Sequence, residues 1–370
     1  MIFYSLSKDE DLLREKVKIL RRRSFDVRYV ISLINKYDAG KFPKDLRKMG
    51  IKRAIQLASN ENPYPPPEEV LETIRREAIW VNRYPHPEYS ELKEKIAEYC
   101  GVEEKMVSLG SGVMDILKTI ADVLLEPFDK VVVPMPSYSY YTFVSMLRDA
   151  GVEEKVFEGY RVEVGDLSGK LIFLCSPNNP TGNTLEEKVV RDACENFEYV
   201  VLDEAYAEFA GKSFVHLLEE YENLIILRTF SKYFGLAGLR IGYALSSEYI
   251  AEALEKIRSP FAISPIAAKA AECALENREY YERVRRKIVS LREKMRKALE
   301  RYYFVYPSEA NFLLFRHDEK DLVNEFLRRG VILRDVTGLR GLEGFHVRVT
   351  VGRESEVEVF LEILRDLNEN

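Results

Sequence analysis

The stretch TFSKYFGLAGLR, residues 229–240, places Lys232 directly after Ser231 and eight residues before Arg240. An apolar run at 224–227 leads into it and predicts a strand. A lysine at a strand end can form a Schiff base through its amine, while a hydroxyl and a guanidinium hold a phosphate. The stretch therefore predicts a site for a phosphorylated aldehyde cofactor. The alternative is a solvated lysine on a loop.

Length and composition indicate a soluble globular protein. The chain has 370 residues, 46% of them apolar, with a formal net charge of −6, which gives no basic surface for nucleic acid. We find no apolar run long enough to cross a membrane. The N-terminus carries acids and lacks a signal-peptide core, so we expect a cytoplasmic protein. The cysteines and histidines are scattered, and we predict neither disulfides nor a metal site.

Alternating strand and helix signals predict an α/β fold with a mostly parallel central sheet covered by helices. The apolar runs that carry this prediction lie at 130–134, 154–157, 170–175, 199–203, 224–227 and 241–245. A long charged helix at about 278–301 then leads to a smaller α+β domain. Its expected strands lie near 311–315, 331–333 and 346–351, and its helices at 320–329 and 354–368. We therefore predict an N-terminal helical extension (1–35), a large domain (36–277) and a small C-terminal domain (278–370). Within the large domain, an arm at 36–85 contributes to the substrate site.

Two strand ends carry polar side chains suited to a heterocycle. Asp203 follows three apolar residues, and a buried acid usually has a cationic partner, such as a protonated pyridine nitrogen. Tyr206, three residues on, can donate to a phenolate oxygen. Asn179 lies in the proline-rich string SPNNPTG (176–182), where it offers a fixed amide at the carboxyl end of a strand. A helix-capping aspartate and a plain turn are the alternatives.

Glycines before a predicted helix indicate an anion site. The string GSGVMD (110–115) opens a helix that extends to about residue 125. Gly112 allows the backbone N–H groups of Val113 and Met114 to meet a phosphate, helped by the helix dipole. The string lacks the third glycine of a dinucleotide-binding fingerprint, and an ordinary tight turn is the alternative.

Together these groups fit pyridoxal phosphate, which needs an amine, an acid at its ring nitrogen, donors to its ring oxygen, a stacking face and a phosphate cup. Tyr138, in the string PSYSYY (136–141), is the candidate for stacking, whereas packing is favoured for Tyr140 and Tyr141. Lys232 is the candidate for the amine and Asp203 for the acid. Asn179 and Tyr206 are the candidate donors to the ring oxygen, and the Gly112 helix with Ser231 and Arg240 is the candidate phosphate cup. The acid would keep the ring nitrogen protonated, so that the ring can absorb the charge of a substrate carbanion.

The string FHVRVTVG (345–352) is a predicted strand with Arg348 in its middle. An arginine near a sheet is costly unless it meets an anion, and its planar fork suits a carboxylate. A surface salt bridge is the alternative.

On these motifs the chain resembles the class I/II aminotransferases, pyridoxal-phosphate enzymes of fold type I, and is most similar to the histidinol-phosphate aminotransferases. The resemblance runs from about Tyr37 to the C-terminus. The strings that carry it are ASNENPY (58–64), RYP (83–85), SPNNPTG (176–182), DEAY (203–206), SKYFGLAGLR (231–240) and RVTVG (348–352).

The resemblance implies roles for several residues. Lys232 would bind the cofactor aldehyde, and Arg348 would clamp an α-carboxylate. Tyr84 would reach the cofactor phosphate of the neighbouring subunit, which implies a homodimer. Arg334 would anchor the substrate's own phosphate, and Asn179 would face the substrate as well as the cofactor.

The arm loop with Asn60 and Glu61 would close over the substrate. The implied reaction converts histidinol phosphate and 2-oxoglutarate into imidazole-acetol phosphate and glutamate, in histidine biosynthesis. Threonine-phosphate decarboxylase, aromatic amino-acid transamination and a non-catalytic cofactor-binding regulator are the alternatives. Two features depart from the family pattern: the residues 113–115, where a small residue followed by Asp and Glu is usual, and the glycine-rich segment 338–344, which can alter specificity.

Overall fold

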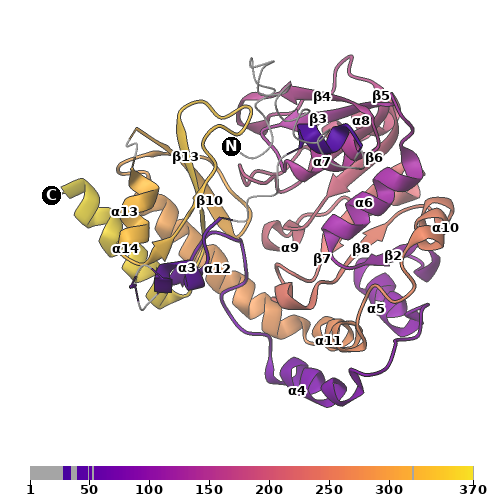
Figure 1. Ribbon diagram of the computed structural model, residues 1–370, viewed down its shortest axis with the longest axis horizontal. Coiled ribbons are helices and arrows are strands. Elements are labelled where there is room, and N and C mark those ends of the chain that lie inside the picture. The colour runs from indigo at the N-terminus through magenta and orange to yellow at the C-terminus, as the bar shows by residue number, and fades with distance from the viewer. Residues whose placement is uncertain (1–27, 35–39, 49, 52–53, 319–320, 370) are drawn as a thin grey trace, which may run out of the picture.

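The computed structural model describes residues 28–34, 40–48, 50–51, 54–318 and 321–369 (Figure 1). Most of the predicted extension 1–35 therefore lies outside the described residues. Its described part contains the short helix α2 (Val30–Leu33), which packs against α7 (Tyr140–Leu147).

Seven strands form the central sheet in the order β2-β8-β7-β6-β5-β3-β4. Their bounds are β2 Val107–Gly110, β3 Lys130–Met135, β4 Gly151–Val156, β5 Gly169–Cys175, β6 Phe197–Asp203, β7 Leu224–Thr229 and β8 Gly242–Leu245. β8 runs antiparallel to both of its neighbours, and the other pairs are parallel. The predicted mostly parallel sheet is confirmed. The short strand β2 was not among the predicted strands, and β4 starts three residues earlier than predicted.

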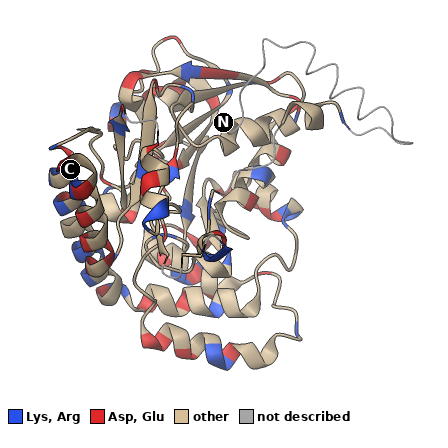
Figure 2. Cartoon of the chain, turned by 60° about the vertical axis from the view of Figure 1, so that its left-hand side comes forward, with Lys and Arg blue, Asp and Glu red and all other residues tan. Residues whose placement is uncertain are grey.

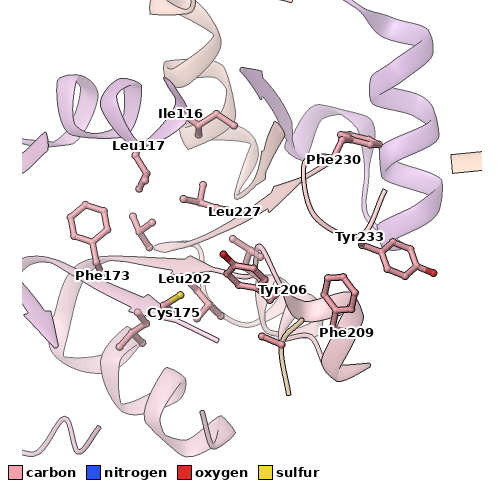
Figure 3. Packing of buried hydrophobic residues seen from close by; sticks show 14 of the residues in the cluster. Ile116, Leu117, Phe173, Cys175, Leu202, Tyr206, Phe209, Leu227, Phe230 and Tyr233 are labelled. Atoms are coloured by element: carbon pink, nitrogen blue, oxygen red, sulfur yellow. The ribbon is translucent and has the colours of Figure 1, made fainter. Parts of the chain in front are cut away.

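Helices cover both faces of this sheet, so its central strands are largely buried (Figure 1). All six residues of β7 are buried, as are the last five of β5. Figure 3 shows Ile116 and Leu117 of α6 (Val113–Leu124) above strand residues such as Leu227 and Phe173. The other helices of this domain are α4 Glu68–Glu77, α5 Ser90–Cys100, α8 Glu187–Asn196, α9 Ala207–Ala210, α10 Glu248–Ile257 and α11 Pro265–Glu276.

The small domain is an antiparallel sheet of order β12-β13-β10-β9 backed by helices. Its strands are β9 Phe304–Val305, β10 Phe312–His317, β12 Arg334–Asp335 and β13 Phe345–Thr350, and its helices are α12 Arg278–Leu299, α13 Leu322–Arg328 and α14 Glu354–Glu369. The predicted long connecting helix corresponds to α12. Figure 2 shows acidic and basic positions intermixed along the outer helices. Within the part of the chain that the structure describes, no helix has the length and apolar character needed to cross a membrane.

The N-terminal arm joins the two domains. Its helix α3 (Pro43–Lys48) and strand β1 (Ile55–Gln56) contact the small domain, where β1 pairs in parallel with β11 (Val331–Ile332). Leu46 and Ala58 pack with Leu327 and Ile332 in a separate apolar cluster. The predicted domain division assigns the whole arm to the large domain. In the structure this part buries its apolar side chains on the small domain instead, while α4 packs on α11 of the large domain. The boundary at residue 278 stays a prediction.

A buried ion cluster fixes the ends of β6 and β7 relative to each other. Arg228 on β7 lies 2.8 Å from Glu204, which follows β6, and 2.8 Å from Glu208 on α9; the three side chains are 7%, 0% and 6% exposed. Glu204 also accepts hydrogen bonds from the Ser213 hydroxyl at 2.9 Å and the Phe214 N–H at 2.7 Å. A buried charge is tolerated when it is paired in this way.

Replacing Arg228 with methionine keeps an unbranched apolar stem but leaves two carboxylates buried without their cation. We expect the free energy of unfolding to fall by about 3–5 kcal/mol, measured by chemical denaturation. Arg191→Met is the control, because Arg191 pairs with Glu220 at 2.6 Å near the surface. That variant should lose no more than about 1 kcal/mol. Equal losses in the two variants would contradict a special role for the buried cluster.

Candidate active site

A cavity of about 650 Å³ lies at the carboxyl ends of β3, β5, β6 and β7 and is bounded by the arm and the small domain. Ligands bind at this edge in open α/β sheets. The predicted site residues that line it are Asn60, Glu61, Val113, Met114, Tyr138, Asn179, Asp203, Tyr206, Ser231, Lys232, Arg240, Arg334 and Arg348. Of the remaining two, Gly112 contacts this set through Arg240, and Tyr84 lies elsewhere. The structure thus brings nearly all of them together, while their individual roles stay predictions.

Lys232 is half-buried and lines the cavity, three residues after the end of β7. Its Nζ donates a hydrogen bond to the backbone oxygen of Ser59 at 2.8 Å. The pKa of Lys232 is lowered from 10.5 to about 8, mainly by burial and next by the positive charge of Arg348, against the attraction of Glu61 and Asp203. A larger fraction of neutral amine makes this lysine a better nucleophile than a solvated one.

Asp203 ends β6 with its carboxyl group buried beside the cavity. Its Oδ1 accepts a hydrogen bond from the Ala205 N–H at 2.9 Å, and its Oδ2 accepts one from the Tyr141 hydroxyl at 2.8 Å. Burial raises the pKa of Asp203, and these two hydrogen bonds oppose that rise. A cationic partner in the cavity would stabilise the charged form of this acid.

Tyr141 is the functional candidate that sequence reasoning missed. The sequence favoured simple packing for it, and its ring does stack on Phe173, with centroids 5.0 Å apart. Its hydroxyl, however, also donates to Asp203 and so orients the predicted acid. The one sequence feature that sets Tyr141 apart is its spacing of three residues from Tyr138. This spacing does not identify Asp203 as its hydrogen-bond partner.

The start of α6 forms a cradle suited to a phosphate. Gly112 precedes the helix with φ of +83°, and the first N–H groups of a helix have no partner within the helix. Arg240 Nη1 donates to the Ser231 hydroxyl at 3.4 Å. A Cβ atom at Gly112 would lie 2.6 Å from Arg240 Nη2, so a side chain there would collide with the guanidinium. Backbone N–H groups, a hydroxyl and a guanidinium therefore converge at one anion-binding site.

The unusual residues 113–115 leave this cradle intact. Asp115 Oδ2 accepts a hydrogen bond from the Ser111 N–H at 2.9 Å and so stabilises the turn that precedes the helix. The backbone donors of Val113 and Met114 do not depend on side-chain identity.

Arg348 joins three parts of the chain at the cavity. Its Nη1 donates to Asn179 Oδ1 at 2.6 Å, and its Nη2 donates to the Ala58 backbone oxygen at 2.7 Å. Arg334 on β12 stands directly opposite Arg348 on β13 in the strand register, and both line the cavity. Like charges directly opposite each other on neighbouring strands destabilise a sheet, so an anion bound beside them is favoured.

Asn60 is held by hydrogen bonds to several distant parts of the chain. It is buried with φ of +53°, a left-handed conformation that asparagine tolerates. Its Nδ2 donates to the Tyr206 hydroxyl at 3.0 Å, its N–H donates to Thr350 Oγ1 at 2.9 Å, and its backbone oxygen accepts from Asn311 at 3.1 Å. Burial raises the pKa of Tyr206 to about 12, so its hydroxyl keeps its proton at neutral pH.

Tyr84 does not reach this cavity within its own chain. Its side chain is 81% exposed and stacks on Phe261, with ring centroids 4.4 Å apart. Ile79, Trp80 and Val81 nearby in the chain are exposed as well. These side chains give the large domain an exposed apolar segment.

The residues of the cavity fit the predicted cofactor. A helix start with a guanidinium and a hydroxyl, a buried acid, an amine and a tyrosine ring face one volume. Gly112 adopts a φ of +83° at the helix start, and a Cβ atom there would lie 2.6 Å from the Arg240 guanidinium, so the glycine leaves room for the arginine beside the helix start. A phosphorylated pyridine aldehyde matches this set of groups.

The chain is similar to known proteins in its family, its sequence and its structure. The family described as aminotransferase class I and II matches residues 52–364. Histidinol-phosphate aminotransferase 2 of Archaeoglobus fulgidus is 45% identical over 346 residues, which cover 92% of this chain and 100% of the relative. Histidinol-phosphate aminotransferase of Thermococcus gammatolerans is 41% identical over 321 residues, covering 85% of this chain and 92% of the relative. The crystal structure of histidinol-phosphate aminotransferase from Sinorhizobium meliloti in complex with pyridoxal-5'-phosphate matches with a TM-score of 0.80 and 26% identity, covering 91% of this chain and 97% of the other.

The lowered pKa of Lys232 gives a pH-dependent stability. Between about pH 8 and 10.5 the unfolded chain holds the lysine proton and the folded chain has lost it, so stability rises with pH in this window. In cofactor-free protein we expect Lys232→Met to be more stable than the wild type at pH 7. The difference in the free energy of unfolding between this variant and the wild type should shrink by about 3 kcal/mol between pH 7 and pH 10.5.

Chemical denaturation at several pH values measures this difference. Lys188→Met, at an exposed position of α8, is the control and should show no such narrowing. A constant difference between the wild type and Lys232→Met from pH 7 to 10.5 would mean that the lysine is not held in a pKa-lowering environment.

Proposed function

The chain belongs to the class I and II aminotransferases, and from this we propose that it transfers the amino group of histidinol phosphate to 2-oxoglutarate with pyridoxal phosphate as cofactor. The products are imidazole-acetol phosphate and glutamate, in histidine biosynthesis. The observation that supports this best is the convergence of Lys232, Asp203, Arg334 and Arg348 on one cavity. An amine, an acid and two anion-binding groups are what a transaminase of phosphorylated and carboxylated substrates requires.

Three groups of side chains would hold the cofactor. Ser231, Arg240 and the start of α6 would hold its phosphate, and Tyr138 would stack on its ring. Asp203, oriented by Tyr141, stabilises a proton on its ring nitrogen. When bound in this way, the cofactor supplies an electron sink for the negative charge that develops at the substrate α-carbon.

Lys232 has two tasks in this proposal. Its amine would bind the cofactor aldehyde, and its Nζ, when free of the cofactor, would take the proton from the substrate α-carbon. A base with a pKa of about 8 is well matched to this task near neutral pH. Tyr206, which keeps its proton, donates to the ring oxygen together with Asn179.

The two arginines divide the anionic groups of the substrates. Histidinol phosphate has no α-carboxylate, so Arg334 holds its phosphate, whereas Arg348 binds the α-carboxylate of glutamate. Asn60 and Glu61 come from the arm, and Asn179 from the loop after β5. They complete the wall around the substrate.

We further propose a cytoplasmic homodimer in which Tyr84 reaches the cofactor phosphate of the neighbouring subunit. The exposed side chains of Ile79, Trp80, Val81, Tyr84 and Phe261 support it, because such an apolar segment is favoured at an interface. The four cysteines are free thiols, as is usual in a reducing compartment.

Product analysis tests the reaction. Purified protein is given histidinol phosphate, threonine phosphate or tyrosine, each with and without 2-oxoglutarate. We expect glutamate and imidazole-acetol phosphate from histidinol phosphate, and only when 2-oxoglutarate is present. Release of CO2 from threonine phosphate without 2-oxoglutarate would identify a decarboxylase instead, and a preference for tyrosine would identify an aromatic aminotransferase.

Lys232→Ala tests the role of the lysine. Turnover should be lost, and borohydride reduction of the cofactor-loaded protein should no longer label a peptide that contains residue 232. Lys188→Ala, on the surface of α8, should keep its turnover and the labelling of the peptide that contains Lys232. Retained turnover in Lys232→Ala would refute the proposed mechanism.

Subunit mixing tests the placement of Tyr84. Tyr84→Ala and Lys232→Ala are each expected to be nearly inactive. If Tyr84 serves the neighbouring subunit, hybrid dimers hold one complete site, and an equal mixture should recover roughly a quarter of wild-type activity. No recovery, in a mixture shown to exchange subunits, would place Tyr84 in its own subunit's site or outside the sites altogether.

A further inference from the structure

The connection between β12 and β13, residues 336–344, forms part of the cavity wall. Val336 and Leu339 both line the cavity. Val336 is buried in a small apolar cluster with Leu314 and Leu342, and Leu339 packs against the same cluster. This connection follows Arg334 directly in the chain, so it places an apolar surface beside the arginine proposed to hold the substrate phosphate.

An ion pair ties this connection to the large domain. Arg340 Nη1 lies 3.2 Å from Glu154 Oε2, and Glu154 is on β4, the edge strand of the central sheet. The Glu154 side chain is 7% exposed, and its Oε1 accepts a hydrogen bond from the Thr142 hydroxyl at 2.7 Å. Thr142 follows Tyr141, which orients Asp203. The ion pair thus links the small-domain wall to the helix that supports the acid.

A glycine lets the connection approach the large domain closely. Gly341 has φ of +87°, and a Cβ atom there would lie 3.0 Å from both the nitrogen and Cδ of Pro136. Pro136 precedes Ser137, which lines the cavity. At the other end, the Thr337 hydroxyl accepts a hydrogen bond from the His346 N–H at 3.1 Å, and the Thr337 N–H donates to Asp335 Oδ1 at 2.8 Å. The connection is therefore anchored on both domains.

We propose that residues 336–344 determine side-chain specificity, an inference that rests on the proposed transaminase function. Leu339 and Val336 pack against the apolar ring of the substrate, while Arg340 and Glu154, which lie outside the cavity, are positioning residues that hold this wall in place. An imidazole or phenyl ring presents a wide apolar face, whereas the glutamate side chain ends in a carboxylate. Ring-bearing substrates therefore gain more from this wall than glutamate does.

Leu339→Ala tests the wall itself in the two half-reactions of the holoenzyme. The ratio of the KM for histidinol phosphate to the KM for glutamate should rise about tenfold, with kcat changed far less. Leu339→Met keeps the apolar surface and should restore most of the wild-type ratio. A KM ratio that stays unchanged in Leu339→Ala would overturn the inference.

Arg340→Gln and Glu154→Gln test the anchoring. Each should raise the KM for histidinol phosphate by about two- to fivefold, and the double variant should be no worse than the single ones, because both remove the same ion pair. Arg286→Gln is the matched control, since Arg286 pairs with Glu282 at the same 3.2 Å on the surface of α12, and its KM should not change. If the increases in KM caused by the two single substitutions multiply in the double variant, the positioning role is refuted.

A failure of the proposed substrate is distinguishable from a failure of this inference. If the wild type accepts tyrosine and not histidinol phosphate, the proposed function is wrong, and the same variants are compared on tyrosine against glutamate. A rise of the KM for tyrosine alone then supports the proposed role of residues 336–344 in specificity. An equal rise of the KM for tyrosine and for glutamate refutes it.

Discussion

The parallel pairing of β6 with β7 is the constraint on which the candidate site depends. Asp203 ends one strand and lies in register with Leu227 of the other, and Lys232 follows five residues after Leu227. Both groups therefore emerge at one edge of the sheet, where neither is well solvated. The paired ions Arg228 and Glu204 fix these same two strand ends from within the core, so the acid and the short loop that carries the amine both start from a fixed base.

The substrate side of the cavity depends on contacts between segments that are distant in sequence. Arg348 from the small domain donates to Asn179 of the large domain and to Ala58 of the arm. Asn60 is held by Thr350 and Tyr206 in the same region. Because each segment ends in a hydrogen bond to another, the wall around the substrate is preorganised, which lowers the entropy lost when a substrate is positioned.

The sequence predicted what local signals encode. Apolar runs that end in a polar residue located Asp203, Asn179 and Lys232, and glycines before a helix located the phosphate cradle. The structure added what depends on tertiary contacts: Tyr141 reaches Asp203 across 62 positions, and Asn60 meets Thr350 across 290. No periodicity encodes such pairs. β2 was missed because its residues VSLG alternate with a serine and a glycine and form no apolar run. The start of β4 was predicted three residues too late because this edge strand, with half-exposed side chains, lacks a continuous apolar run.

Binding of an anion and basicity of the lysine are coupled through Arg348. The positive charge of this arginine is the second largest cause of the lowered pKa of Lys232, after burial. A carboxylate bound at Arg348 would neutralise that charge and so raise the pKa of the amine. In the proposed reaction, the free protein therefore favours the neutral amine that binds the cofactor. The complex with glutamate favours a stronger base at the moment when a proton must leave the α-carbon. In the proposed reaction, the same pair of residues thus links recognition of the substrate to its chemistry through electrostatics.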